Sequence, residues 1–181
     1  MMEVWDLYDK DRIKTGKTMY RGDAVPDGFY RMVVHIAIFN SDGRMLIQQR
    51  QPFKSGWSGM WDITVGGSAV AGENGSEAAH RELFEEIGID IDFSDKRPNF
   101  TLHFNGGFDD VYLVKHDVDI SRVKLQQSEV ASVKFATKEE IYSMIDNGEF
   151  IPYHKSMIDM MFFLKDVRSA HTASDKSKTK A

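Results

Sequence analysis

The chain has 181 residues, a length that fits one domain with a hydrophobic core and is short for two. Hydrophobic residues make up 41% of it and cysteine is absent, which excludes a chain that is disordered throughout, a disulfide framework and a thiolate metal site. The formal net charge is −5, and because residues 165–181 carry five basic and two acidic side chains, the rest is more acidic still and repels long nucleic acids unless a cation intervenes.

The first third of the chain predicts a series of strands. They are expected over residues 4–21 (a hairpin-like pair), 31–39, 44–50 and 61–65. The turn Asn40-Ser-Asp-Gly43 separates the second and third of these segments, because its residues tolerate positive φ. An irregular loop is expected from Pro52 to the last strand, which the pair Gly66-Gly67 ends.

The last part of the chain predicts more strands and two helices. The strands are expected over residues 100–104, 110–115 and 129–136. A capping box at Thr137 begins one helix, which ends near Asn147-Gly148, and Pro152 suits the first turn of another. The methionines and other apolar residues of this last helix predict core packing. Residues 1–168 are therefore expected to form a single domain, and residues 169–181 a disordered tail.

Between these two parts, residues 67–89 predict a glycine loop followed by a helix. Asn74 can cap the helix together with Glu77, and Gly88 can end it in the left-handed conformation. At about 100° per residue, three glutamates share an arc of roughly 100° on this helix. They are Glu82, Glu85 and Glu86, and the apolar residues on the far side are Leu83, Phe84 and Ile87. The helix is thus predicted to carry a carboxylate face.

Three carboxylates at spacings of three and four residues repel one another, so a positive group is expected beside them. A hard divalent cation such as Mg²⁺ takes oxygen ligands and commonly keeps substrate phosphate oxygens in its shell. Arg81 is a second candidate, because its guanidinium can fork onto Glu73 or a neighbouring glutamate and hold the loop and helix in register. A merely solvated acidic face would be the alternative for an isolated pattern of this kind.

The spacing of this segment resembles the signature of the Nudix superfamily, G-x5-E-x7-R-E-U-x-E-E-x-G-U. Every fixed slot is filled, by Gly67, Glu73, Arg81, Glu82, Leu83, Glu85, Glu86, Gly88 and Ile89. The resemblance implies an α/β/α sandwich with a central mixed sheet, with residues 67–89 as the Nudix box. It also implies a hydrolase that cleaves a diphosphate linkage in a nucleoside diphosphate derivative or a similar small diphosphate.

The resemblance also implies roles for individual residues. Glu82, Glu85 and Glu86 correspond to metal ligands, the carbonyl of Gly66 is a further ligand candidate, and Arg81 helps to aim the ligands. The metal is expected to be Mg²⁺, with Mn²⁺ as the alternative. One of these glutamates or a later one acts as the base for the attacking water. The later candidates are Glu129 first, and then Asp109, Asp110 and Glu139.

The segment from Trp5 to Gly22 resembles the branch of the superfamily that is related to type I isopentenyl diphosphate isomerases. An isomerase is therefore one alternative, which is disfavoured because those enzymes use a cysteine in the strand before the box and this chain has none. A catalytically silent Nudix domain that binds a ligand is the other alternative. It is disfavoured because all the box carboxylates are present.

The sequence leaves the substrate itself open. Five aromatic residues either stack a base or pack in the core: Tyr30, Phe53, Trp57, Trp61 and Phe108. His35 is interpreted as structural. We expect a cytoplasmic protein that binds a small-molecule diphosphate and neither membrane nor long nucleic acid, because no long apolar run or export signal is visible. A homodimer is suggested by analogy with the family alone.

Overall fold

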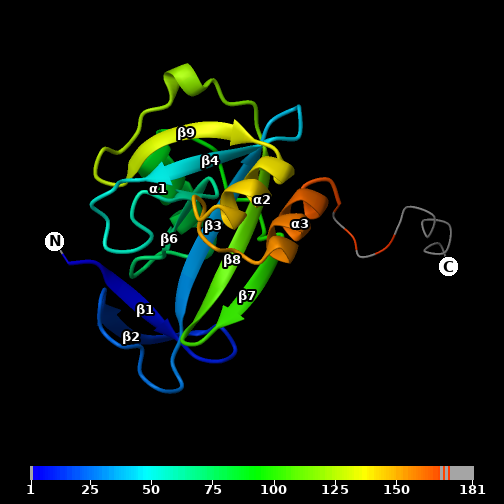
Figure 1. The fold of residues 1–181 in the computed structure, drawn as a ribbon. Helices are drawn as coiled ribbons and strands as arrows, with labels where there is room; N and C mark the ends of the chain where they lie inside the picture. Colours follow the sequence, from blue (N-terminus) through cyan, green and yellow to red (C-terminus); the bar gives the residue numbers. More distant parts are fainter. Residues whose placement is uncertain (1, 168, 170, 172–181) are drawn as a thin grey trace, which may run out of the picture.

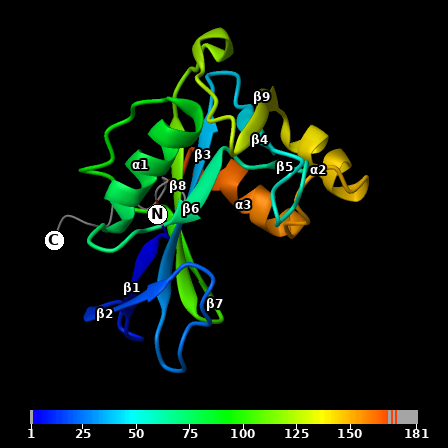
Figure 2. The same cartoon turned by 90° about the vertical axis from the view of Figure 1, so that its left-hand side faces the viewer.

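A computed structural model describes residues 2–167, 169 and 171. Its centre is a seven-stranded mixed sheet, which α1 covers on one face and α2 and α3 on the other (Figures 1 and 2). The predicted α/β/α sandwich is thus confirmed. The strands of this sheet are β3 (Arg31–Phe39), β4 (Met45–Arg50), β5 (Trp61–Asp62), β6 (Val65–Ser68), β7 (Phe100–Phe104), β8 (Gly107–Lys115) and β9 (Val130–Ala136). The helices are α1 (Gly75–Ile87), α2 (Lys138–Asp146), α3 (Lys155–Leu164) and the short 3₁₀ helix η1 (Ile120–Arg122).

Strand β3 is the centre of the sheet. It pairs in parallel with β8 and antiparallel with β6, and it meets β4 only where Phe39 opposes Met45. Alternation along β3 sends Val34, Ile36 and Ile38 into the core under α1, and Phe39 into the core under α2 and α3. Since β3 and β4 diverge beyond their single register pair, β6 can pair with β3 while β5 and β9 pair with β4.

The predicted N-terminal hairpin is present as β1 (Val4–Tyr8) and β2 (Lys14–Tyr20), which form a separate antiparallel sheet. It contacts the loop of the Nudix-like motif through a backbone hydrogen bond from the Ala71 amide to the Val4 carbonyl and through two side chains. Asp6 accepts a hydrogen bond from the Gly72 amide at 2.8 Å, and Lys14 donates to the Glu73 carbonyl at 2.8 Å. The hairpin therefore braces the loop that precedes α1.

Helix α1 begins and ends as its sequence predicts. The Asn74 side chain accepts from the backbone amides of Ser76 and Glu77, the Glu77 side chain completes the capping box, and Gly88 adopts φ 68°. Leu83 and Ile87 are buried, but Phe84 is 54% exposed, so the expected apolar face was wrong at this residue. Phe84 instead stacks against His80, four residues earlier on the outer side of the helix.

Two further expectations differ from the structure, and a third falls mostly outside the described residues. The pair Gly66-Gly67 does not end a strand but lies within β6. Helix α3 begins at Lys155 after His154, so Pro152 precedes it, where Tyr153 is held by Asp62. The tail predicted from residue 169 lies outside the described residues except for Ser169 and His171.

We predict that Asn74→Ala lowers the free energy of unfolding by about 1 kcal/mol, because two amide donors at the start of α1 lose their acceptor. Urea denaturation monitored by circular dichroism measures this change. Asn74→Ser is the matched control, since serine keeps an acceptor oxygen and should stay close to the parent protein. Equal stability of the parent and the alanine variant would contradict the role of this cap.

Candidate active site

Gly67 allows a carboxylate of α1 to lie directly against strand β6. A Cβ atom placed on Gly67 would lie 2.1 Å from both Cδ and Oε1 of Glu82, far inside van der Waals contact. Any side chain at this position would therefore displace the Glu82 carboxylate. The first glycine of the motif is thus required for this close approach.

Arg81 connects the oxygen-bearing groups of the motif. Its Nε and Nη2 atoms donate to the two carboxylate oxygens of Glu73 at 2.6 and 2.9 Å, so the predicted fork is present. Its Nη1 atom lies 3.0 Å from Glu82 and 3.3 Å from Glu85. Nη2 also donates to the Ser68 carbonyl at 3.1 Å. These contacts, first of all that with Glu73, raise the pKa of Arg81 and fix the loop against the helix.

Glu86 is buried beside a strand residue that the sequence analysis did not single out. It is 7% exposed, and the Gln48 side-chain amide donates to it at 3.0 Å. Burial, reinforced by the negative charge of Glu82, raises the pKa of Glu86 to about 8. Within the described part of the chain, the buried Oε1 atom of Gln48 has no hydrogen-bond partner. Among the described residues, Glu86 thus has one neutral side-chain donor, the Gln48 amide, and no ion-pair partner.

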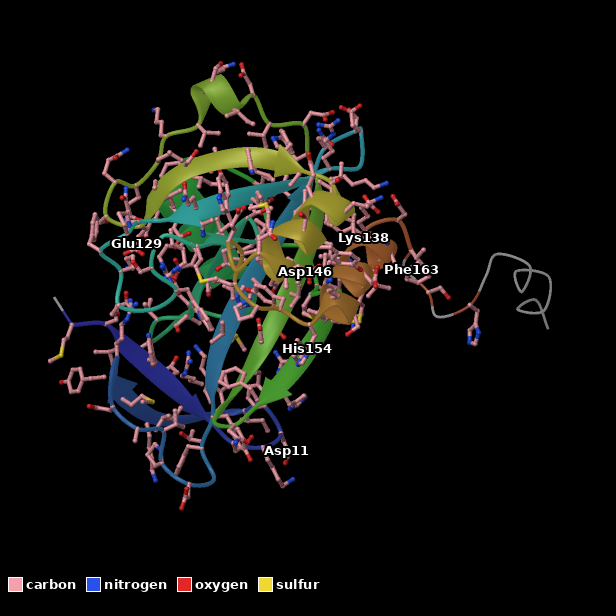
Figure 3. The ribbon with its side chains drawn as sticks, viewed as in Figure 1. Asp11, Glu129, Lys138, Asp146, His154 and Phe163 are labelled. Atoms are coloured by element: carbon pink, nitrogen blue, oxygen red, sulfur yellow. The ribbon has the colours of Figure 1, made fainter. Side chains whose placement is uncertain are left out.

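The remaining glutamates are more accessible. The Glu85 side chain is 50% exposed and contacts only Arg81 among the ion pairs of the described residues. Glu129 lies just before β9 (Figure 3), and its carboxylate pairs with Lys54 at 2.5 Å. Its charge also contributes to the raised pKa of Glu86, so Glu129 belongs to the same electrostatic neighbourhood. Lys54, in the irregular loop after β4, was missed by the sequence analysis.

The other candidates for the general base beyond the box already have hydrogen-bond partners or lie on the opposite face of the sheet. Asp110 is 3% exposed and accepts hydrogen bonds from Arg12 and Thr101. Asp109 pairs with His35 at 2.7 Å. Glu139 lies in the first turn of α2, on the face of the sheet opposite α1.

A second set of polar side chains is buried or partly buried in the sheet, namely His35, Asp109 and Asp62. Burial lowers the pKa of His35, but the hydrogen bond and charge of Asp109 outweigh this effect, so its pKa lies above the ordinary value. Asp62 accepts a hydrogen bond from the Tyr153 hydroxyl at 2.9 Å, and burial raises the pKa of its carboxyl. The sequence contains one signal for such buried polar residues, which is a polar residue within an apolar strand segment. Gln48 follows Met45-Leu-Ile in this way, and Asp62 lies between Trp61 and Ile63.

Comparison with known proteins agrees with this geometry. The family model of the NUDIX domain matches residues 29–159, which is more than half of the chain. The chain belongs to the Nudix hydrolase family. A protein named as an uncharacterized Nudix hydrolase in Listeria monocytogenes is 45% identical to it over 170 residues, which cover 94% of this chain and 99% of that protein. Enzymes of this family act on acid anhydrides in small-molecule substrates.

Two further Nudix relatives bear on the fold and the branch. The crystal structure of DR0079 from Deinococcus radiodurans shares a TM-score of 0.70 and 25% identity, covering 88% of this chain and 97% of that one. An isopentenyl-diphosphate Delta-isomerase of Pectobacterium atrosepticum is 29% identical over 144 residues, 75% of this chain and 76% of that enzyme. Proteins named as isopentenyl-diphosphate isomerases are therefore among the relatives of this chain at low identity.

Nudix hydrolases generally use divalent metals such as Mg²⁺, and the donor set here fits one. In the described residues, no three Asp, Glu or His side chains already form a metal-binding group. The reason is visible in the contacts: Arg81 draws on Glu82 and Glu85, while Glu86 faces Gln48. The pKa of Glu86 is raised, and the Oε1 atom of Gln48 has no hydrogen-bond partner among the described residues. No cation pairs with Glu86 there, and these oxygen atoms are ligands that suit a hard cation.

No helix in the part of the chain that the structure describes is long and apolar enough to span a membrane.

We predict that Gly67→Ala weakens Mn²⁺ or Mg²⁺ binding by about 10- to 100-fold, because the new methyl group displaces Glu82. Isothermal titration calorimetry measures the affinity, and circular dichroism checks the fold. Gly56→Ala is the control, since a Cβ there meets no atom within 4 Å. Unchanged affinity in Gly67→Ala would show that the Glu82 position does not matter for metal binding.

We also predict that the metal-free protein becomes less stable as the pH rises from about 5 to 8. A carboxyl whose pKa is about 8 when folded and near 4.5 when unfolded stabilises the fold only while it is protonated. Asp62 and His35 also bind protons more tightly in the folded state, so their contributions have the same sign. The measurement is the melting temperature in a chelating buffer.

Glu86→Gln should reduce this loss of stability, whereas Glu149→Gln, at an exposed position, should leave it unchanged. A melting temperature that rises from pH 5 to pH 8 would contradict the burial argument.

Proposed function

We propose that this protein hydrolyses the diphosphate linkage of a nucleoside diphosphate derivative or a similar small diphosphate in a Mg²⁺-dependent reaction. The observation that carries the proposal is the row of box glutamates, in which Glu82 lies against Gly67 and Glu86 is buried in a cation-poor region. Such an acidic region binds a negatively charged phosphate group only when a cation neutralises the negative charge of the carboxylates and of the phosphate. The same cation would compensate the buried charge of Glu86.

We assign Glu82, Glu85, Glu86 and the Gly66 carbonyl as metal ligands. When bound, the metal would neutralise the phosphate oxygens and lower the pKa of a coordinated water. Arg81 keeps Glu82 and Glu85 beside the loop through its contacts with Glu73, and is a positioning residue. Mn²⁺ is proposed as the alternative ion.

A general base has to be ionised at neutral pH and reachable by water. Glu129 and Glu85 can be reached by water, because the side chains of both are partly exposed. Glu86 without metal does not meet the first of these conditions, since its pKa is about 8. Glu129 is therefore our first candidate among the later residues, and its ion pair with Lys54 has to open before it can accept a proton.

The isomerase alternative is disfavoured by the residues of β6. The strand before the box contains Gly66 and Gly67 and no cysteine, and the chain has no cysteine elsewhere. Its two glycines provide no acid or base. A silent binding module is disfavoured because Glu82, Glu85 and Glu86 are all present and Arg81 holds the row together. A cytoplasmic location and a homodimer remain proposals from the sequence.

We predict that the purified protein releases phosphate or a mononucleotide from at least one member of a panel of nucleoside diphosphates, nucleotide sugars and nucleoside triphosphates. Mg²⁺ or Mn²⁺ should be required, and Glu86→Gln should reduce turnover by orders of magnitude while the protein stays folded. Glu149→Gln is the matched control, because this exposed glutamate lies far from the box in the chain.

Two results would contradict the proposal. One is unchanged turnover in Glu86→Gln. The other is conversion of isopentenyl diphosphate to its isomer without phosphate release, which would favour the isomerase alternative.

A further inference from the structure

The N-terminal hairpin of β1 and β2 lies outside the part of the chain that the NUDIX domain model matches. The model matches residues 29–159, whereas the hairpin spans residues 4–20. The hairpin nevertheless lies next to the box loop, residues 69–74, which joins β6 to α1 (Figure 2). Residues outside the matched domain therefore contact the motif that carries the candidate active site.

The box loop is attached to the hairpin by hydrogen bonds at three consecutive residues. Two of these bonds come from loop amides, and the third ends on a loop carbonyl. They join the Ala71 amide to the Val4 carbonyl at 2.7 Å, the Gly72 amide to the Asp6 carboxylate at 2.8 Å, and the Lys14 ammonium to the Glu73 carbonyl at 2.8 Å. Because both strands of the hairpin take part, a movement of the hairpin also moves the loop.

Asp6 and Lys14 are the two side chains of this attachment. Their charged groups are 2.8 Å apart, and the side chains are 15% and 37% exposed. Burial raises the pKa of Asp6, but the hydrogen bonds from Lys14 and from the Gly72 amide outweigh it, so this pKa lies below its ordinary value. Asp6 is therefore ionised at neutral pH, and its hydrogen bonds to the loop and to Lys14 are charge-assisted.

The attachment leads directly to the arginine of the motif. Glu73, whose carbonyl accepts from Lys14, binds Nε and Nη2 of Arg81 through its carboxylate. Arg81 also contacts Glu82 at 3.0 Å and Glu85 at 3.3 Å. If the backbone at Glu73 shifts, Arg81 loses its fork and can move onto Glu82 and Glu85. There it competes with a metal cation for the same oxygen atoms.

The turn of the hairpin is anchored separately, under the start of α1. Arg12 donates to Asp110 at 2.5 Å and to Thr101 at 3.1 Å, and its guanidinium carbon lies 5.2 Å from the centre of the Phe108 ring. A Cβ atom on Gly75, the first residue of α1, would lie 3.2 Å from Oδ2 of Asp110. The hairpin is thus held in place on both sides of the loop that it contacts.

We propose that Asp6 and Lys14 are positioning residues of the metal site. They fix the box loop so that Glu73 retains Arg81, and Glu82 and Glu85 stay available to a divalent cation. The inference deepens the proposed function and rests on its assignment of these two glutamates as metal ligands. A hairpin that only stabilises the fold would leave the metal affinity unchanged.

The first measurement is amide hydrogen exchange in the metal-free, full-length protein, followed by NMR. In Asp6→Ala the Gly72 amide loses its acceptor and should exchange at least about tenfold faster. Asp11→Ala is the matched control, because Asp11 lies in the hairpin turn (Figure 3), is exposed and pairs only with Lys10 among the ion pairs of the described residues. Exchange of the Gly72 amide should be the same in this control as in the parent protein.

The second measurement is the affinity for Mn²⁺ alone, determined by isothermal titration calorimetry without substrate. Asp6→Ala and Lys14→Met should each weaken Mn²⁺ binding by about 10- to 100-fold, as expected for groups that orient metal ligands. Lys14→Arg should restore most of the affinity, because arginine keeps a long cationic donor. Lys10→Met, at an exposed lysine of the same hairpin, should bind Mn²⁺ like the parent protein.

Lys14→Met covers the case in which Asp6→Ala fails to fold, since it leaves the contact between Asp6 and Gly72 in place. Parent-like Mn²⁺ affinity in a folded Lys14→Met or Asp6→Ala protein would overturn the inference, whatever the turnover of that variant. Weakened Mn²⁺ binding in both variants, together with a parent protein that hydrolyses no diphosphate, would refute the proposed function and support the positioning role.

Discussion

The architecture depends on the absence of side chains at two consecutive positions of β6. Gly66 lies under the His35 ring and Gly67 lies under the Glu82 carboxylate, and each contact is closer than any Cβ atom permits. Because neighbouring residues of a strand face opposite sides, β6 meets a carboxylate of α1 on one face and the imidazole of its neighbouring strand β3 on the other. His35 and Glu82, which are far apart in the sequence, thereby lie on the two faces of the same strand.

This arrangement concentrates negative charge that the protein itself compensates only in part. Arg81 serves Glu73, Glu82 and Glu85 at once, and a single guanidinium cannot also reach Glu86 on the inner side of the row. Glu86 is left with the neutral amide of Gln48. Its raised pKa follows from that geometry, since a buried carboxylate without a cation favours the protonated form. Ligand binding is a common reason for a fold to retain such a destabilising group.

Structural features that depend on residues close in the sequence could be predicted, whereas contacts between distant strands could not. The caps of α1 at Asn74 and Gly88 depend on neighbours within four residues, so their sequence pattern was sufficient. The fork between Arg81 and Glu73 followed from the fixed spacing of the motif. In contrast, the pairing of His35 with Asp109 requires that β3 and β8 run in parallel, and nothing near either residue indicates this.

The same reason explains the other omissions. Gln48 faces Glu86 because β4 turns away from β3 after one register pair, and Lys54 reaches Glu129 because β4 and β9 are neighbours. The expected end of a strand at Gly66-Gly67 was wrong because glycine was interpreted as a strand breaker, whereas here it accommodates close packing on both faces. A glycine pair next to a carboxylate helix can thus indicate proximity as well as a turn.

The two faces of β6 differ in how many residue contacts a single substitution disturbs. On the α1 side, Gly67, Glu82, Arg81 and Glu73 contact one another, so replacing any one of them disturbs the others. On the α3 side, Gly66 meets the His35 ring, and this ring lines an open cavity together with α3 and the loop before it. Substitutions in α3 therefore do not alter the contacts of Arg81 with Glu73, Glu82 and Glu85 directly.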